Sequence, residues 1–253
     1  MPGNFAVTPI ELLILVGIFI VARIVLSMQP VRANSAERST AFAREYLDPF
    51  IVAGLAAFLL ITFVARTYYI PSGSMIPTLK IGDVLLVNKF EYRFTKPHEG
   101  DIVVFPPPVP SPDDFIKRVI GRPGDRLRIH DGVVYLNGSA LPESYINAKP
   151  AYELVIKNYG VYVGDTANEL VPVDPTNGNI PPKSAWTAPD RIPPNCYFMM
   201  GDNRNDSEDS HIWGFAQLHG NFATGPRHGE ASHFTGRAFV VFWPFSHAHI
   251  LSN

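Results

Sequence analysis

Residues Ile10 to Met28 read IELLILVGIFIVARIVLSM, and Phe50 to Ala65 read FIVAGLAAFLLITFVA. These two apolar runs decide how the chain divides, because a helix needs about 20 apolar residues to cross a bilayer. We interpret both as transmembrane helices. For the first run the alternative is a cleaved signal peptide, but nothing basic precedes its apolar core and no small-x-small site closes it. For the second, shorter run the alternative is a buried core helix.

Basic residues in the short flanking loops orient the two predicted helices. The tail before Ile10 has no Lys or Arg, whereas the segment between the runs carries Arg32, Arg38 and Arg44. Because basic loops stay on the cytoplasmic side, this segment is predicted to be cytoplasmic. The expected division is 1–29 for the first helix with a short outer tail, 30–48 for the cytoplasmic loop, 49–67 for the second helix and 68–253 for a periplasmic domain.

The outer domain is predicted to be mainly β. Beyond residue 70 the apolar runs become short and are separated by Gly, Pro and Asp, which favours antiparallel strands. Candidate strands are Asp83 to Lys89, Asp101 to Phe105, Phe115 to Ile120, Arg126 to His130, Val133 to Leu136 and Ala238 to Trp243. Asp131-Gly132 predicts a hairpin turn, and the proline-rich stretch 106–112 predicts a loop. Residues 137–195 are interpreted as a variable β-containing excursion.

Composition excludes some classes of protein. A formal net charge of -2 and a pI near 6.4 provide no basic footprint for nucleic acid. Cys196 is the only cysteine, so neither an intramolecular disulfide nor a cysteine-based zinc site can form.

The segment after the second apolar run, IPSGSMIPTL from Ile70 to Leu79, is the strongest candidate for chemistry. Two prolines fix φ on either side and Gly73 lacks a Cβ, so the segment is expected to be a rigid turn that presents the hydroxyl of Ser74. The alternative is an ordinary linker, since small residues mark turns more often than nucleophiles.

A serine hydroxyl needs a base, and none of the eight histidines stands in a recognisable serine–histidine pattern. The other option is a lysine held neutral. Lys117 and Arg118 interrupt an apolar strand, and alternation predicts that one of them points toward packed apolar side chains. Lowering a lysine pKa from about 10.4 to about 7–8 corresponds to roughly 3–4 kcal/mol, which burial can supply. The alternative is a lysine at the rim of the sheet.

Four segments resemble the bacterial type I signal peptidases, also called leader peptidases, in the order found in that family. They are PSGSMIPTL at 71–79, GDVLLVNKF at 82–90, KRVIGRPGD at 117–125 and GDNRNDSEDSHIWG at 201–214, with Gly236-Arg237-Ala238 as a weaker fifth. The resemblance implies a largely β catalytic domain with an apolar face on the membrane. It implies a serine endopeptidase that removes signal peptides after Ala-x-Ala sites.

Carried over by position, the resemblance implies Ser74 as nucleophile and Lys117 as general base. It implies that the Ser72 hydroxyl and the Ser74 backbone N–H form the oxyanion hole, that Ser207 orients the lysine amine, and that Asp209 braces this region. From the residues themselves, Gly201, Asp202, Asn203 and Arg204 are expected to form a rigid turn that places Ser207. Arg204 interrupts what would otherwise be a calcium-type loop, so no metal is predicted there. The dyad needs no cofactor.

Substrate and location follow from the same reading. The apolar neighbours of the proposed dyad are expected to wall shallow pockets for small side chains, or else to be plain core; they are Ile70, Met75, Leu79, Phe115 and Ile116. The predicted partners are signal peptides of exported preproteins, the lipid bilayer and the protein export machinery. The predicted location is the bacterial cytoplasmic membrane, with the catalytic domain in the periplasm.

The chain departs from the family pattern at three places. Asn205-Asp206 stands where the family has Asp-Asn, and His211 stands where it has an arginine expected to pair with Asp209. A histidine pairs most strongly with a carboxylate when protonated, so bracing is predicted to weaken at high pH. The His/Gly-rich stretch 216–235 is longer than the family's connection and is expected to be a solvated loop.

Three other functions compete with this interpretation. A self-cleaving repressor-type Ser/Lys protease would be soluble and carry a DNA-binding domain. A membrane-tethered receptor for exported chains would lack Ser74 or Lys117, and both are present. An organellar inner-membrane processing peptidase is poorly separated by sequence alone, although no transit-like Arg/Ser-rich leader precedes the first predicted span.

Overall fold

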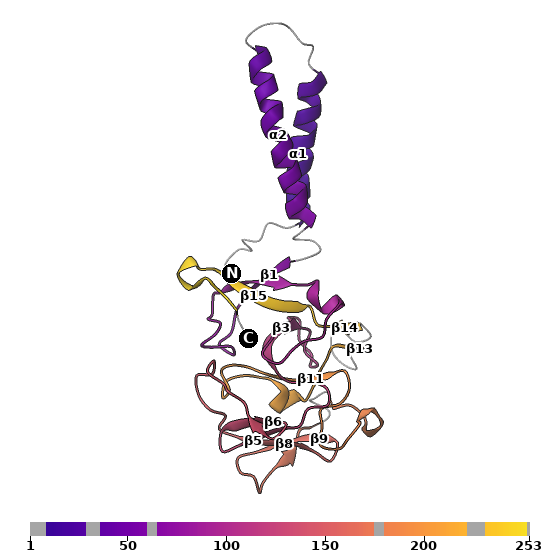
Figure 1. Ribbon diagram of the computed structural model, residues 1–253, viewed down its shortest axis with the longest axis vertical. Helices are drawn as coiled ribbons and strands as arrows, with labels where there is room; N and C mark the ends of the chain where they lie inside the picture. Colours follow the sequence, from indigo (N-terminus) through magenta and orange to yellow (C-terminus); the bar gives the residue numbers. More distant parts are fainter. Residues whose placement is uncertain (1–8, 29–35, 60–64, 175–179, 222–230, 252–253) are drawn as a thin grey trace. The chain divides into compact units, whose positions relative to one another are not determined.

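The computed structural model describes residues 9–28, 36–59, 65–174, 180–221 and 231–251. The chain divides into two compact units, Met1–Thr67 and Tyr68–Asn253, and each is described by itself (Figure 1).

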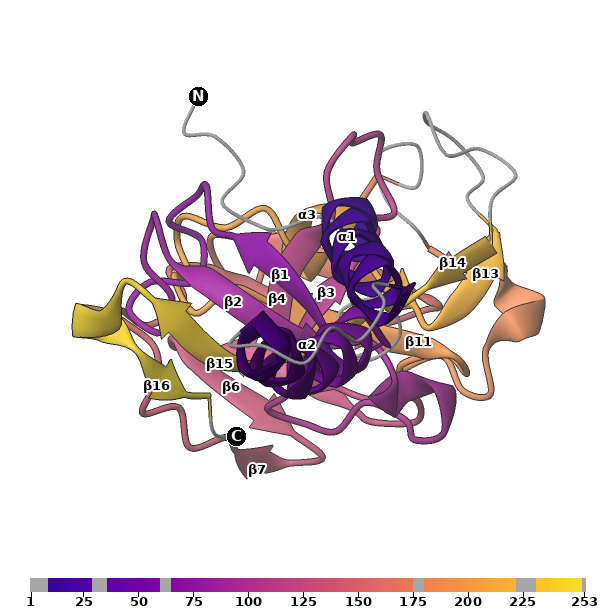
Figure 2. The same ribbon diagram turned by 90° about the horizontal axis from the view of Figure 1, so that it is seen from above.

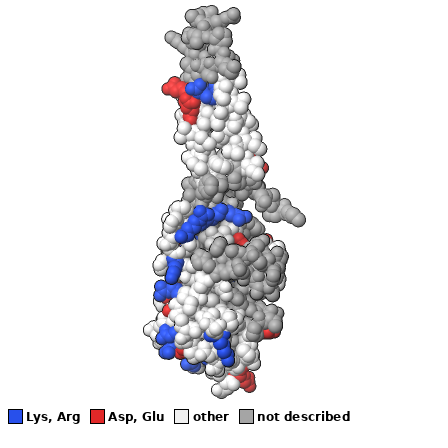
Figure 3. Space-filling view, turned by 90° about the vertical axis from the view of Figure 1, so that its right-hand side faces the viewer, with Lys and Arg blue, Asp and Glu red and all other residues white. Residues whose placement is uncertain are grey.

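The first unit is a pair of helices, α1 (Pro9–Met28) and α2 (Ala36–Leu59), that lie side by side. Arg23 Nε donates to Asp48 Oδ1 across the pair at 2.8 Å. Val16 is only 2% exposed and lies against Gly54, where a larger residue would overlap its side chain. Other apolar side chains of both helices face outward, among them Ile10, Leu13, Ile14, Leu15, Ile18, Val21, Ile24, Val25, Phe50, Val52, Leu55 and Leu59. Figure 3 shows the described surface of this unit almost free of charge apart from one small group.

The helix boundaries differ from the predicted ones. α2 begins at Ala36, inside the predicted loop 30–48, because its first residues include strong helix formers, and it continues through Pro49. Residues 65–67, the end of the predicted second helix, belong to strand β1 (Ala65–Tyr69), since Thr67, Tyr68 and Tyr69 favour a strand. Within the described residues no helix combines the length and apolarity required for a bilayer crossing. The transmembrane interpretation and its orientation stay predictions, and the outer tail and Arg32 fall outside the described residues.

The second unit is built on two antiparallel sheets. The larger sheet has the order β1-β2-β15-β3-β4-β11-β12, with β16 paired to β15. Its strands are β1 (Ala65–Tyr69), β2 (Val84–Asn88), β15 (Gly236–Trp243), β3 (Ile102–Phe105), β4 (Phe115–Gly121), β11 (Cys196–Met200), β12 (Ala216–Gln217) and β16 (His249–Ile250). Figure 2 shows β1, β2, β3, β4 and β15 side by side. Strand β15, which is far from both in the sequence, thus lies between β2 and β3.

The smaller sheet has the order β10-β9-β8-β5-β6-β7, and four of its strands, β7 to β10, come from the predicted excursion. Its strands are β5 (Leu127–His130), β6 (Val133–Leu136), β7 (Ser139–Ala140), β8 (Glu153–Lys157), β9 (Gly160–Gly164) and β10 (Val171–Pro172). The predicted hairpin is confirmed: His130 pairs with Val133, and both Asp131 (φ 50°) and Gly132 (φ 69°) adopt the positive φ of a two-residue turn.

Shorter elements complete the second unit. They are α3 (Ser210–Trp213), the 3-10 turns η2 (Glu91–Arg93), η3 (Lys183–Ala185) and η4 (Phe245–His247), and a ribbon of β13 (His219–Asn221) and β14 (Ala231–His233). The ribbon corrects the expectation of a simple loop over 216–235: its backbone groups pair between the two strands. The tip, 222–230, is outside the described residues.

β4 and β11 lie between hydrophobic clusters that cover both of their faces. Ile120 and Phe198 pack in one cluster, and Val119 and Met199 in another. This explains why Lys117 and Arg118 on β4 are only 5% and 2% exposed. The prediction that one of the two points toward packed side chains is confirmed, and in addition the second is buried, because alternation exposes one side chain only when a strand is covered on one face, and β4 is covered on both.

Candidate active site

Ser74 lies in the turn that joins β1 to β2. Met75 and Leu79 anchor this turn in the core, with 2% and 0% of their surfaces exposed. The Ile76 N–H donates to the Gly73 carbonyl at 3.1 Å, and the Leu79 N–H donates to the Met75 carbonyl at 2.9 Å. The turn therefore holds Ser74 half-buried at the surface of the large sheet.

Lys117 reaches Ser74 from strand β4. Its Nζ is hydrogen-bonded to Ser74 Oγ at 2.9 Å. Burial lowers the pKa of Lys117 below its ordinary value, since a charged ammonium is poorly solvated there. The carboxylates of Asp209, Glu208 and Asp202 act in the opposite direction but do not cancel the effect of burial.

Asn203 connects the 201–211 loop to the serine turn. Its backbone N–H donates to the Ser74 carbonyl at 3.1 Å. Its side-chain Nδ2 donates to the Gly73 carbonyl, also at 3.1 Å. The backbone on both sides of the Gly73–Ser74 peptide is thereby fixed by one residue.

Gly201 allows this loop to approach the serine. A Cβ at this position would overlap both Ser207 Oγ and the Ser74 carbonyl oxygen, so no larger residue fits without movement. The Gly201 N–H donates to Asp209 Oδ2 at 3.0 Å.

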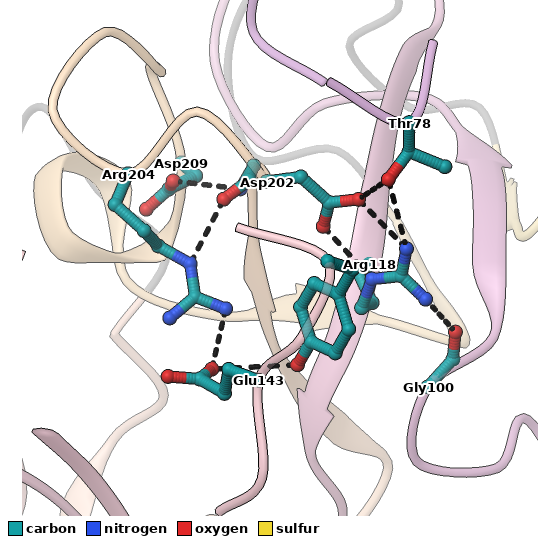
Figure 4. Close-up of polar contacts among 9 residues, drawn as sticks. Thr78, Gly100, Arg118, Glu143, Asp202, Arg204 and Asp209 are labelled. Atoms are coloured by element: carbon teal, nitrogen blue, oxygen red, sulfur yellow. Dashed lines mark hydrogen bonds and ion pairs between the residues drawn. The ribbon is translucent and has the colours of Figure 1, made fainter. Parts of the chain in front are cut away.

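The Asp202 carboxylate forms a buried ion pair with Arg118 (Figure 4). Arg118 donates from Nε to Oδ1 at 2.8 Å and from its second terminal nitrogen to Oδ2 at 2.7 Å. The Thr78 hydroxyl also donates to Asp202, and Arg118 donates to the Gly100 carbonyl at 2.8 Å. A bidentate pair with these extra partners ties β4 to the 201–211 loop.

Arg204 is fully buried. Its Nε donates to the Gly201 carbonyl at 3.0 Å, and its guanidinium pairs with Glu143 from the excursion (Figure 4).

Asp209 caps the short helix α3. Its carboxylate accepts the His211 N–H at 3.2 Å and lies 2.7 Å from His211 Nδ1. The predicted pairing of His211 with Asp209 is therefore present, and the ring of Tyr152 stacks on that histidine at 4.5 Å.

Two predicted site residues lie near the dyad without the expected contacts. Ser72 Oγ is 3.5 Å from Ser74 Oγ and its side chain is exposed. Ser207 Oγ is buried and has no hydrogen-bond partner among the described residues, so the expected bond to Lys117 is not formed in this structure.

The predicted pocket residues separate into two groups. Ile70, Met75 and Leu79 are at most 3% exposed and pack in one hydrophobic cluster, so they are core and offer no surface to a peptide here. Ile116 and Phe115 are partly exposed, and the Phe115 ring centroid lies 5.3 Å from Lys117 Nζ. Only these two stay candidates for a pocket wall.

Sequence reasoning missed Thr78, Arg118 and Glu143. Arg118 had a visible signal, because a second charged residue inside an apolar strand requires a buried partner. Glu143 had none, because it lies in the aperiodic excursion.

Among the described residues, one group could hold a metal ion: His130, Asp131 and Glu153 at the β5–β6 turn. It lies on the smaller sheet, and its histidine already pairs with Glu153 at 2.8 Å. It contributes nothing to the serine–lysine pair.

Chemically, a hydroxyl hydrogen-bonded to a buried amine of lowered pKa is an arrangement for nucleophilic acyl transfer.

The family model described as "Signal peptidase, peptidase S26" matches residues 43–243. The chain belongs to this signal peptidase family, and within it to the type I enzymes.

Individual relatives agree with the family model. Probable signal peptidase I-2 from Synechocystis is 37% identical over 88% of this chain and 85% of its own length. Signal peptidase I from Leptolyngbya laminosa is 37% identical over 72% of this chain and 71% of its own. Probable signal peptidase I-1 from Synechocystis is 40% identical over 69% and 76%. A crystal structure of a signal peptidase I from Enterococcus faecalis aligns with 49% of this chain and 91% of its own, at 28% identity and a TM-score of 0.32.

Proposed function

We propose that this chain is a membrane-bound serine endopeptidase that removes N-terminal signal peptides from exported preproteins with a Ser74/Lys117 dyad. The observation that carries the proposal is the 2.9 Å hydrogen bond between the Ser74 hydroxyl and the buried amine of Lys117. Membership of the signal peptidase family supplies the substrate class.

In the proposed mechanism the neutral Lys117 amine takes the Ser74 proton while Oγ attacks the scissile carbonyl carbon. The oxyanion that forms accepts hydrogen bonds from the Ser74 N–H and from the Ser72 hydroxyl, after a side-chain rotation of Ser72. The Lys117 ammonium then gives its proton to the leaving amine, and an acyl-enzyme remains. Lys117 next takes a proton from water while the water oxygen attacks the ester carbon. When the bond to Ser74 Oγ breaks, the Lys117 ammonium returns that proton to Oγ, so the carboxylic acid product leaves and both the serine hydroxyl and the neutral amine are restored.

For specificity we propose cleavage after small-x-small sites, of which Ala-x-Ala is the best match. Phe115 and Ile116 flank the dyad on β4 and leave part of their surface open. Bulky walls beside the nucleophile favour small side chains in the substrate because larger ones would overlap them.

For location we propose the bacterial cytoplasmic membrane, with α1 and α2 as the anchor and Tyr68–Asn253 in the periplasm. The outward-facing apolar side chains of both helices support a lipid environment, since water-exposed helices carry a polar face. Residues 60–64, which continue the apolar run in the sequence, lie outside the described residues. The lipid bilayer and the protein export machinery are the proposed partners besides the preproteins.

The test is cleavage of a purified preprotein with an Ala-x-Ala site by the detergent-solubilised chain from pH 6 to pH 10. Ser74→Ala and Lys117→Ala should each lose activity by a factor on the order of 10² to 10⁴, whereas the exposed Lys96→Ala should match wild type. Wild-type activity should rise with pH through a pKa below that of free lysine. Full activity in either dyad variant would refute the mechanism, and binding of preprotein without cleavage by wild type would favour a receptor.

A further inference from the structure

Residues 143–152 of the excursion run along the 201–211 loop, and we call this segment the strap. At one end, Glu143 pairs with the buried Arg204, and the Tyr145 hydroxyl donates to Glu143 at 3.3 Å. The Tyr145 ring lies 3.9 Å from the guanidinium carbon of Arg118. The strap is thus attached to the buried ion-pair network drawn in Figure 4.

At its other end the strap is held by the side-chain amide of Asn205. Asn205 Oδ1 accepts the Ala151 N–H at 2.8 Å, and Nδ2 donates to the Lys149 carbonyl at 2.9 Å. Only an amide makes both bonds, because an aspartate has no donor for the carbonyl. Asn205 is also one of the places where this chain departs from the family pattern.

Between these two ends the strap contacts the residue that holds the serine turn. Asn147 Nδ2 donates to Asn203 Oδ1 at 2.9 Å. Asn203 Nδ2 therefore faces the other way, toward the Gly73 carbonyl. The side-chain amide of Asn203 has nearly the same shape in both orientations, but its Nδ2 donates and its Oδ1 accepts. Because Asn147 donates, it stabilises the orientation in which Oδ1 faces Asn147 and Nδ2 donates to the Gly73 carbonyl.

We propose that the strap positions the nucleophile, with Asn147 as a positioning residue that acts through Asn203 on the Gly73–Ser74 backbone. Asn147 touches neither Ser74 nor Lys117 in the contacts of the described residues. Its contribution is to fix the orientation of Asn203 Nδ2, which donates to the Gly73 carbonyl and so keeps Ser74 Oγ within hydrogen-bond distance of Lys117 Nζ. The excursion, which is far from the dyad in sequence, thereby takes part in the chemical step. This inference rests on the proposed dyad.

The chemistry of the amide predicts an order among variants. Asn147→Ala removes the bond but leaves Asn203 free to keep its orientation. Asn147→Asp replaces the donor by acceptor oxygens, which attract Asn203 Nδ2 and turn its Oδ1 toward the Gly73 carbonyl. The kcat should therefore fall by about two-fold to ten-fold in Asn147→Ala, the rate equivalent of one hydrogen bond, and further in Asn147→Asp.

The experiment measures kcat, KM and thermal unfolding for the full chain in detergent with the Ala-x-Ala preprotein. Asn168→Asp, an exposed position in the loop between β9 and β10, is the matched control for added charge and should equal wild type. Support is a fall in kcat in the stated order with KM and the unfolding temperature nearly unchanged. Wild-type kcat in Asn147→Asp, or equal losses in both variants that follow the unfolding temperature, would overturn the inference. An inactive wild type would instead refute the proposed function.

Discussion

Replacing Asp202 by asparagine should destabilise the β unit far more than its small change in shape suggests. The side chain keeps its volume, but the Arg118 guanidinium, 2% exposed, is left without a counter-charge. Breaking a buried ion pair by removing one partner costs about 3–5 kcal/mol, because the remaining charge stays in a poorly solvating environment. Against a total stability of about 5–15 kcal/mol this is a large fraction.

A surface pair of similar length provides the control. Arg126 Nε lies 2.8 Å from Asp190, but their side chains are 59% and 40% exposed. Exposed pairs contribute about 0–1 kcal/mol, so Asp190→Asn should change little. The two ion pairs have similar N–O distances but differ in burial, so a difference in the free energy of unfolding between the two variants reports the effect of burial.

The assay is denaturant unfolding of the detergent-solubilised chain, followed by tryptophan fluorescence, to which the buried Trp213 contributes together with Trp186 and Trp243. Adding Arg118→Met to Asp202→Asn should recover part of the loss, since no unpaired buried charge remains. A loss below about 1 kcal/mol in Asp202→Asn, equal to that of Asp190→Asn, would show that burial of this pair does not matter and would refute the reasoning.

Three further predictions concern the loop that approaches the dyad. Glu208→Gln removes a carboxylate that raises the pKa of Lys117. The amine should therefore stay neutral to lower pH, and the acid limb of the pH–rate profile should shift to lower pH. An acid limb that stays in place or moves to higher pH would contradict this. Gly201→Ala should reduce kcat at least about ten-fold, because the new Cβ displaces the Ser74 carbonyl. A variant with wild-type kcat would show that the 201–211 loop can move to accept the methyl group without displacing Ser74. His211→Arg should raise the unfolding temperature more at pH 8.5 than at pH 6, since arginine stays charged at both values; equal shifts would exclude pH-dependent bracing.

Two kinds of strand could be predicted from sequence. β2 alternates in burial along VLLVN, and the β5–β6 hairpin carries its own turn signal in Asp131-Gly132. β3 and β4 are largely buried but are rich in Val and Ile, which favour strands. β11 was missed because CYFMM shows no alternation and contains no β-branched residue. The two-residue strands β7, β10, β12 and β16 are too short for any pattern.

The site was predictable in its residues but less so in its contacts. A constrained turn and an interrupted apolar strand made Ser74 and Lys117 candidates, and the resemblance to type I signal peptidases selected them over the linker and sheet-rim alternatives. The distance between Ser74 Oγ and Lys117 Nζ could not be predicted, because it depends on the pairing of strands that are far apart in the sequence. For the same reason the sequence did not predict that Ser207 makes no hydrogen bond to Lys117 or that Glu143 pairs with Arg204.

The position of β15 in the large sheet has a consequence for the order in which the enzyme matures. β2 follows the Ser74 turn, β3 leads to Lys117, and the strand that joins them, Gly236–Trp243, is synthesised after both. The alignment of the serine turn with the lysine strand therefore waits until Gly236–Trp243 has paired with β2 on one side and β3 on the other.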